Sequence, residues 1–364
     1  TNGYESWIWD DDKYPPRKIQ GFYTIDQLQL LIERRTLRKA LYGQDVNRNI
    51  VDRPYQIRVI QSLSESFESS QRKGLLAMAT GSGKTRTVIA LVDLLMRNGW
   101  VKRVLFLADR VALVNQAVNS FKIHLPQSSP VNLVTEKDSI GRVYVSTYPT
   151  MMGLIDQFDD GQRKYGVGYF DLIVIDEAHR SVYKKYGAIF DYFDSLLVGL
   201  TATPRDEVHH DTYRMFNLET GLPTDAYSLK EAIDDKYLVP YKAISVPLKF
   251  QREGIKYDEL SEDEKAQWEE LDWGDEEIPE AVDSSAVNKW LFNEDTVDKV
   301  LKYLMENGQK IEAGDKLGKT IIFAKNHDHA AFIQKRFDFH YPHLKGHFAR
   351  VIDNRVKYAQ SLID

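Results

Sequence analysis

A glycine-rich run constrains the fold more than any other feature of the sequence. Residues 79–85 read Ala-Thr-Gly-Ser-Gly-Lys-Thr, between the apolar run 75–79 and a helical segment that extends to about Met96. Glycines let backbone N–H groups turn inward around phosphate oxygens, and a helix N-terminus adds a positive dipole. We expect Lys84 to reach the β- and γ-phosphates of ATP and Thr85 to hold Mg²⁺. Met78 stands where the strict P-loop pattern has its first glycine. The expected phosphate-binding residues are Thr80, Gly81, Ser82, Gly83, Lys84 and Thr85.

A pair of carboxylates follows another apolar run. Residues 172–179 read Leu-Ile-Val-Ile-Asp-Glu-Ala-His. A buried strand delivers such side chains at its carboxyl end, where α/β sheets place their ligands. We expect Asp176 to hold Mg²⁺, and Glu177 to orient and deprotonate the attacking water. His179 lies just beyond and is placed to sense the nucleotide from the nucleic-acid side.

Short apolar runs alternate with helical segments from Arg53 onward. Runs of this length without polar alternation are typical of buried parallel strands. With helices between them, they predict a doubly wound α/β sheet. The runs are 75–79, 104–108, 143–146, 172–175 and 196–200. Further on, a helix over 296–305, a buried strand over 320–323 and a helix over 329–337 predict the start of a second α/β domain.

Composition excludes several classes of protein. No apolar run approaches the length of a transmembrane helix, and the N-terminus lacks the basic and apolar regions of a signal peptide. The absence of cysteine excludes disulfides and thiolate metal sites, and favours a reducing cytoplasm. The net charge of −6 argues against a uniformly basic surface for nucleic acid. Because acidic residues are concentrated in the segment 252–283, a local basic face remains possible.

Four segments are expected along the 364 residues. Residues 1–50 resemble the remnant or linker of an upstream domain, and their helical stretch 28–42 carries an apolar stripe that would pack on a larger body. That stripe consists of Leu28, Leu31, Ile32 and Leu37. The other segments are a first ATP-binding domain over 51–205, a connecting segment with the acidic insertion over 206–290, and a partial second domain over 291–364.

The order of these motifs resembles that of superfamily two helicases and translocases, which have RecA-like domains. In this resemblance residues 53–56 are the Q motif, with Gln56 reading the adenine edge and Arg53 or Tyr55 near the ring. The segments that resemble motifs Ia, Ib, III and IV are 107–110 (with Leu113 and Gln116), 145–148, 201–203 and 321–325. The resemblance implies that Thr201 and Thr203 couple hydrolysis to movement. The DNA contacts that it implies are Arg110, Thr147 and Lys325.

More narrowly, the chain resembles the restriction (R) subunit of type I restriction-modification enzymes. The segments that carry this resemblance are 78–85, 176–181, 323–330 and 346–353. It implies a RecA-like P-loop domain followed by the start of a second one, and an ATP- and magnesium-dependent motor on duplex DNA. It also implies methyltransferase and specificity subunits as partners, no membrane attachment, and a bacterial or archaeal cytoplasm.

Two parts of the resembled family are not recognisable in this chain. The family carries an N-terminal nuclease domain, which the leading 50 residues cannot hold. It also carries motifs V and VI, and neither is visible before Asp364. Because motif VI supplies an arginine finger, we expect this chain alone to bind ATP but to hydrolyse it slowly.

Two alternatives remain open. Another DNA or RNA helicase of the same superfamily would use base-stacking aromatic residues along its channel. An ATP-dependent binding switch would move nothing, and stimulation of ATP hydrolysis by nucleic acid would separate it from a motor. A cluster of His209, His210 and Asp211 has side chains that bind metals, but is interpreted as an ordinary solvated loop.

Overall fold

The computed structural model describes residues 1–159, 161–178, 180–203, 208–243, 255–256, 258, 265, 281–282 and 294–353. The chain divides into two compact units, Thr1–Pro240 and Tyr241–Asp364. Most of the expected acidic insertion lies outside the described residues. Among the described helices, none combines the length and the apolar character that crossing a bilayer requires.

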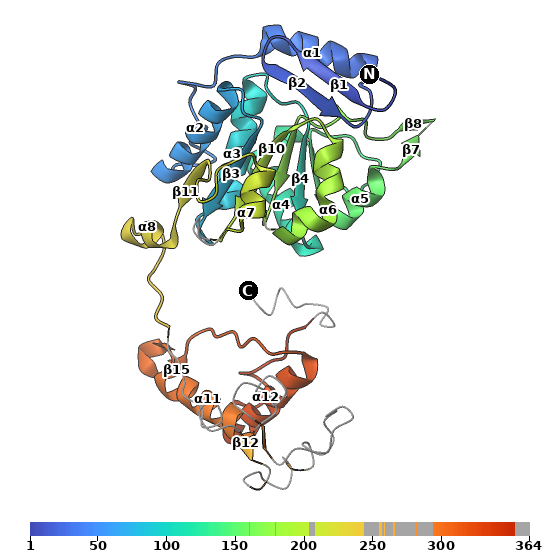
Figure 1. Cartoon of the computed structure of the whole chain (residues 1–364). Helices are drawn as coiled ribbons and strands as arrows, with labels where there is room; N and C mark the ends of the chain where they lie inside the picture. The colour runs from blue at the N-terminus through green and yellow to red at the C-terminus, as the bar shows by residue number, and fades with distance from the viewer. Residues whose placement is uncertain are drawn as a thin grey trace. The chain divides into compact units, whose positions relative to one another are not determined.

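A seven-stranded sheet forms the centre of the first unit (Figure 1). Its strand order is β11–β3–β10–β9–β4–β6–β5, and every neighbouring pair is parallel. The strands are β3 (Lys73–Met78), β4 (Val104–Ala108), β5 (Pro130–Asn132), β6 (Val143–Thr147), β9 (Leu172–Ile175), β10 (Leu196–Thr201) and β11 (Asp225–Tyr227). All five apolar runs expected to form strands do so. The two short edge strands, β5 and β11, were not expected.

Helices cover both faces of this sheet (Figure 1). One face packs against α2 (Pro54–Glu68), α3 (Lys84–Arg97) and α4 (Val111–His124). The other face packs against α5 (Tyr148–Leu154), α6 (Arg180–Tyr192) and α7 (His210–Met215). Successive strand residues alternate between the two cores: Leu76 and Met78 join the first core, and Leu75 joins the second. The doubly wound α/β fold expected from the sequence is therefore confirmed.

The N-terminal residues pack on the first unit. They form the hairpin of β1 (Ser6–Asp10) and β2 (Tyr14–Ile19), followed by α1 (Ile25–Leu37). Helix α1 turns Gln27 and Arg34 inward, and Arg34 pairs at 2.6 Å with Asp171, which directly precedes β9. Because this polar face is turned inward, most of the apolar stripe faces outward. Its exposed members are Leu28, Ile32 and Leu37.

Smaller elements complete the first unit and the connection that follows. They are η1 (Pro126–Ser128), the hairpin of β7 (Phe158–Asp159) and β8 (Gln162–Arg163), α8 (Leu229–Asp234), and the pair β12 (Ile255–Lys256) and β13 (Ala281–Val282). Helix α8 begins with a capping box in which the Ser228 hydroxyl and the Glu231 carboxylate each accept from the other's backbone N–H. Just after this helix, the Tyr237 ring contacts that of Tyr55 at the start of α2.

The second unit contains α11 (Glu294–Asn307) and α12 (His327–His340), which pack through Val297, Leu301 and Phe337. Between them lie the hairpin of β14 (Lys310–Ile311) and β15 (Lys316–Leu317) and the turn η5 (Glu312–Gly314); η6 (Pro342–Leu344) follows α12. Both expected helices are confirmed. The expected buried strand over 320–323 is wrong, because the segment is unpaired and Phe323 is 91% exposed. A strand needs a hydrogen-bonded neighbour, and the described strands of this unit are only the two-residue pairs β12–β13 and β14–β15.

Candidate nucleotide-binding site

The P-loop is a closed turn between β3 and α3. Gly81 and Gly83 have φ angles of 82° and 86°, in the left-handed region that favours glycine. A Cβ atom on Gly83 would lie 2.7 Å from the amide nitrogen of Gln56, so space as well as conformation requires glycine there. The buried Ser82 hydroxyl donates to the Ala79 carbonyl at 2.7 Å and closes the turn. The two glycines and the Ser82 hydrogen bond therefore fix the shape of the loop.

The first turn of α3 is open toward this loop. Its N-cap is Gly83, and no described side chain caps the helix. The N–H groups of the first helical turn have no partner within the helix, so they can bind an anion. The Lys84 ammonium group donates to the Met78 carbonyl at 3.4 Å, a long contact that phosphate oxygens could replace. Thr85 follows on the same turn, whereas the Thr87 hydroxyl is buried and donates to the Gly83 carbonyl.

The first residues of α2 hold the P-loop from the side expected to bind adenine. The Tyr55 hydroxyl donates to the Ser82 carbonyl at 2.6 Å, and the Gln56 amide donates to the same oxygen at 3.2 Å. Arg53 donates to the Tyr55 hydroxyl at 3.0 Å. Gln56 is only 3% exposed. In this structure its amide therefore supports the loop, and its reading of adenine stays a prediction.

Two tyrosines that the sequence did not single out complete this side of the site. The Tyr227 ring, on β11, stacks on Tyr55 with centroids 3.8 Å apart, and the Tyr237 ring meets Tyr55 edge-on at 5.3 Å. The Arg53 guanidinium lies 5.0 Å from the centre of the Tyr237 ring. The Ala79 N–H also donates to the Tyr227 carbonyl at 2.9 Å, which ties β11 to the start of the P-loop. No motif marks these tyrosines, because the edge strand that carries Tyr227 is too short to show a pattern.

The turn that follows β9 is fixed by its neighbours. The Asp176 N–H donates to the Leu107 carbonyl of β4 at 2.9 Å, and the Ala178 N–H donates to the Leu200 carbonyl of β10 at 2.7 Å. The buried Tyr148 hydroxyl donates to the Asp176 carbonyl at 2.8 Å. The backbone of residues 176–178, the described part of the DEAH motif (176–179), is thus held on both sides, and the two carboxylates project from a rigid support. His179, the last residue of the motif, lies outside the described residues.

The two carboxylates of this turn repel each other, and the backbone that carries Glu177 is strained. Burial raises the pKa of Asp176 above its ordinary value, and the neighbouring Glu177 carboxylate raises it further, although Lys84 partly opposes this. Glu177 has a φ angle of 56°, which is uncommon for a residue with a side chain. Backbone strain of this kind clusters at functional sites. A cation beside Asp176 would relieve the repulsion between the carboxylates.

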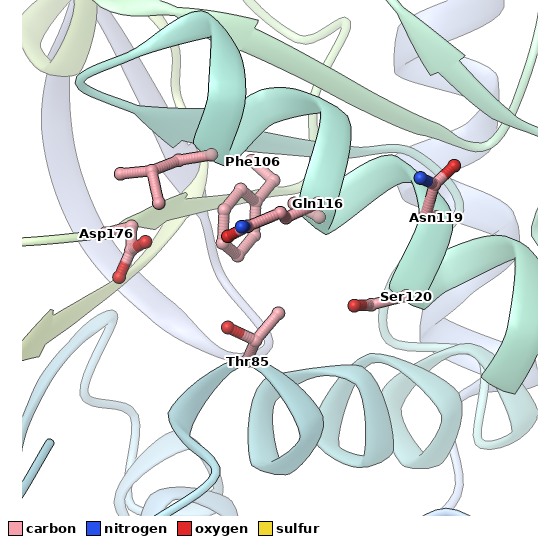
Figure 2. Close-up of a pocket in the computed structure, with 8 residues that line it drawn as sticks. Thr85, Phe106, Gln116, Asn119, Ser120 and Asp176 are labelled. Atoms are coloured by element: carbon pink, nitrogen blue, oxygen red, sulfur yellow. The ribbon is translucent and has the colours of Figure 1, made fainter. Parts of the chain in front are cut away.

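A cleft of about 360 Å³ brings the P-loop and the DEAH motif together. Figure 2 shows Thr85, Asp176 and Gln116 turned toward the same space. Hydroxyl and carboxylate oxygens are ligands that Mg²⁺ prefers, so the pair Thr85 and Asp176 fits the metal expected from the sequence. The cleft is lined by Thr85, Phe106, Leu113, Gln116, Ala117, Asn119, Ser120 and Asp176.

The Thr-Ala-Thr motif lies beside the P-loop strand. Thr201 ends β10 and pairs in register with Ala77 of β3. It is 1% exposed, and its hydroxyl accepts from the Thr203 N–H at 3.1 Å. The motif therefore adjoins the strand that leads into the P-loop, and its coupling role stays a prediction.

The expected DNA contacts differ in their exposure. Register between β4 and β6 pairs Ala108 with Thr147, so Arg110 and Thr147 follow the carboxyl ends of adjacent strands. The Arg110 side chain is 81% exposed. Thr147 is 6% exposed, and its hydroxyl caps α5 by accepting from the Thr150 N–H. Of this pair, only Arg110 has an exposed side chain, and its contact with DNA stays a prediction. In the second unit, Lys325 is exposed just before α12.

The histidine cluster has a structural role in the first unit. His209 is the N-cap of α7, where its ring nitrogen accepts from the Asp211 N–H at 3.2 Å. The potential metal-binding atoms of His209, His210 and Asp211 lie within 4.8 Å of one another. Capping occupies the Nδ1 atom of His209, and His210 and Asp211 begin α7, so the interpretation of these residues as an ordinary loop is wrong.

Comparisons with known proteins relate this site to restriction enzymes. Residues 49–206 match the family model ResIII, described as "Type III restriction enzyme, res subunit". The chain is 30% identical over 287 residues to the type I restriction enzyme EcoAI endonuclease subunit of Escherichia coli, which covers 76% of this chain and 33% of that protein. It is 27% identical over 335 residues to the EcoKI endonuclease subunit of Escherichia coli strain K12, covering 80% of this chain and 27% of that one. The chain thus spans about a third or less of the length of these relatives.

A solved structure has the same fold. It is described as a fragment of an HsdR subunit of a type I restriction enzyme from Vibrio vulnificus YJ016. The match has a TM-score of 0.56 and 24% sequence identity, and covers 94% of this chain and 56% of that one. This likeness supports the RecA-like α/β fold.

Proposed function

From its ResIII domain and its homology to endonuclease subunits of type I restriction enzymes, we propose that this chain is the ATP-driven motor of such an enzyme. ATP hydrolysis would drive movement along duplex DNA. The observation that carries the proposal is the cleft in which Thr85 of the P-loop meets Asp176 of the DEAH motif. This pairing is what nucleotide hydrolysis requires, because it puts phosphate-binding and metal-binding groups in one place.

The P-loop would bind the phosphates of ATP. The glycine-rich loop and the uncapped N-terminus of α3 would present positive charge to the phosphate oxygens. Lys84 would leave the Met78 carbonyl, at 3.4 Å, for the β- and γ-phosphates. On the adenine side, Arg53 and the ring of Tyr237 lie close enough to each other to form one wall for the base. Gln56 would read the adenine edge by moving its amide away from Ser82.

Thr85 and Asp176 would hold magnesium, which when bound neutralises negative charge on the phosphates. Asp176 supplies a carboxylate oxygen and Thr85 a hydroxyl oxygen from opposite sides of the cleft. Glu177, the next residue on a backbone held by two neighbouring strands, would orient the attacking water and accept its proton. His179 would sense the nucleotide state from the nucleic-acid side.

Movement requires a grip on DNA that does not depend on sequence. Contacts to phosphate oxygens meet this requirement. Arg110 in the first unit and Lys325 in the second are exposed cations suited to such contacts. Thr201 and Thr203, next to the P-loop strand, would transmit the nucleotide state to the residues that bind DNA. Methyltransferase and specificity subunits would supply recognition of the target sequence.

Replacement of Lys84 tests the nucleotide site. Loss of its charge-assisted contacts removes about 1.5–3 kcal/mol. Lys84→Ala should therefore weaken binding of a fluorescent ATP analogue by roughly 10–150-fold, at about 1.4 kcal/mol per factor of ten. Lys102→Ala is the matched control, since Lys102 is exposed and lies before β4, at the other end of the strands. Equal affinities for the wild type and Lys84→Ala would refute the assignment of the site.

The motor itself is tested in the assembled enzyme. Displacement of a triplex-forming strand from duplex DNA should require ATP and should be lost in Lys84→Ala. Nucleotide binding without DNA-stimulated hydrolysis or displacement would instead favour an ATP-dependent binding switch. Strand separation without triplex displacement on intact duplex would favour another helicase.

A further inference from the structure

A second, smaller cavity lies at the edge of the sheet opposite the nucleotide site. Its walls include Arg72, Asp171 and Leu196, which stand just before or at the first residues of β3, β9 and β10. The N-terminal hairpin contributes Tyr14, the C-cap of α1 contributes Arg38, and Trp100 and Asp194 also line the cavity. The cavity measures about 30 Å³, which is room for one small ion or water molecule.

Positive charge exceeds negative charge around this cavity. Asp194 is shared by two arginines, with Arg17 at 2.7 Å and Arg72 at 2.6 Å. Asp171 pairs with Arg34 at 2.6 Å, and Asp10 is drawn outward to Arg35 on the surface. The charged residues that line the cavity are Arg17, Arg34, Arg38, Arg72, Asp10, Asp171 and Asp194.

Arg38 differs from the other arginines of this cavity, each of which pairs with an aspartate. Within the part of the chain that the structure describes, it forms no ion pair with a carboxylate. Its guanidinium lies 4.9 Å from the centre of the Trp100 ring and 5.9 Å from that of Tyr14. Ring faces compensate a cation only in part. Burial accordingly lowers the pKa of Arg38 below its ordinary value.

Hydrogen-bond donors around the cavity also lack acceptors. Among the described residues, five buried side-chain atoms have no hydrogen-bond partner, and four of them belong to residues that line this cavity. They are the Tyr14 hydroxyl, Arg17 NH1, Arg34 NH2 and Arg38 Nε. Arg34 NH2 keeps its charge contact with Asp171 without an aligned hydrogen bond. Tyr14 is only 3% exposed, so bulk water does not satisfy its hydroxyl. Buried polar groups in folded proteins are nearly always paired, so an acceptor is needed here.

We propose that this cavity binds one monovalent anion of about the size of chloride. Such an ion accepts hydrogen bonds from several N–H and O–H groups at once and offsets the surplus charge of Arg38. A water molecule would satisfy some donors but would leave that charge uncompensated. Phosphate or sulfate would exceed the available volume. The anion would tie the N-terminal hairpin, through Tyr14 and Arg17, to Arg72 at the start of β3.

Bromide identifies the site directly, because it resembles chloride in size and scatters anomalously. A crystal of the 364-residue chain grown in bromide should show an anomalous peak within hydrogen-bond distance of Tyr14 Oη and Arg38 Nε. In solution, chloride should raise the midpoint of thermal unfolding by roughly 2–5 °C relative to gluconate at equal ionic strength. Arg38→Met should abolish that difference. Arg35→Met, on the same helix but facing the surface, should keep it.

Three results would overturn the proposal. One is a cavity that holds only water in the bromide crystal. Another is an unfolding midpoint that is equal in chloride and gluconate. The third is a chloride effect of the same size in Arg38→Met, which would make it a general salt effect. If Arg38→Met does not fold, Tyr14→Phe keeps the ring, removes one donor, and should reduce the chloride effect.

Discussion

Replacement of Asp194 by asparagine should destabilise the first unit more than any surface change in it. The Asp194 carboxylate accepts two hydrogen bonds from Arg17, both at 2.7 Å, one from Arg72 at 2.6 Å, and a short one from the Tyr23 hydroxyl. Its side chain is 7% exposed. Asparagine has nearly the same shape, but it removes the charge and turns an N–H₂ group toward donors.

The size of the effect follows from burial. Breaking a buried ion pair by removing one partner costs about 3–5 kcal/mol. Arg17 and Arg72 are 18% and 20% exposed, so water partly solvates them and the lower end applies, about 3 kcal/mol. At about 2–4 °C per kcal/mol for a unit of this size, the unfolding midpoint should fall by roughly 6–12 °C. Asp11→Asn is the control, because Asp11 meets Arg35 at 2.8 Å with 67% of its side chain exposed, and should shift the midpoint by less than about 2 °C.

The effect should also depend on pH. Burial alone would raise the pKa of Asp194, but Arg72 and Arg17 outweigh it and hold the pKa below its ordinary value. A lowered pKa contributes stability that is complete above the unfolded pKa, about 3.9, and is lost as pH falls through the folded pKa. The difference in unfolding midpoint between the wild type and Asp194→Asn should therefore be the same at pH 7 and pH 5. This difference should become smaller only below about pH 4. Calorimetry at these pH values measures it. A midpoint within about 2 °C of the wild type at pH 7 would refute the reasoning.

Two further substitutions test the P-loop. Gly83→Ala should cost about 1–2 kcal/mol in stability and weaken nucleotide binding, because φ is 86° and the new Cβ atom would press on Gln56. Gly153→Ala is the control, since Gly153 lies inside α5 with open space around it, and calorimetry should find this variant neutral or more stable than the wild type. A stability change of the same sign in both variants would contradict the reasoning. Thr85→Val should remove most of the magnesium dependence of nucleotide binding. Thr87→Val should keep that dependence, since the Thr87 hydroxyl is bound to the Gly83 carbonyl. Nucleotide titrations with and without magnesium measure the dependence, and an unchanged dependence in Thr85→Val would exclude Thr85 as a magnesium ligand.

The strands that carry the candidate site could be predicted because their information is local. Each buried parallel strand is a continuous apolar run, and the residues that follow it lie at one edge of the sheet by geometry alone. Lys84 and Asp176 could therefore be assigned to one site, and a single cleft indeed has Thr85 and Asp176 in its lining. Thr147 shows the limit of this reasoning, since its place at the edge was predictable but the burial of its hydroxyl in a helix cap was not.

Features that depend on distant partners could not be predicted. The apolar stripe of α1 suggested an inward face, but the pairing of Arg34 with Asp171 turns the helix the other way. Tyr227 joins the site only because β11 pairs with β3, which no local pattern encodes. The segment 320–323 has the composition of a strand, yet it stays unpaired, because a strand forms only with a neighbour.

Strands β3, β9 and β10 lead to the nucleotide site at one end. At their other end lies the cluster of Asp194 with Arg17 and Arg72. Strand β10, for instance, runs from Leu196, just after Asp194, to Thr201 beside the P-loop strand. At about 3.3 Å per residue, the steps from Leu196 to Thr201 separate the two ends by roughly 17 Å. Substitutions more than about 7–10 Å apart without shared partners have independent effects. Asp194→Asn should therefore lower the unfolding midpoint and leave the affinity for the ATP analogue unchanged at a temperature where the protein is folded. A loss of affinity there would mean that the buried strands transmit strain from the N-terminal hairpin to the P-loop.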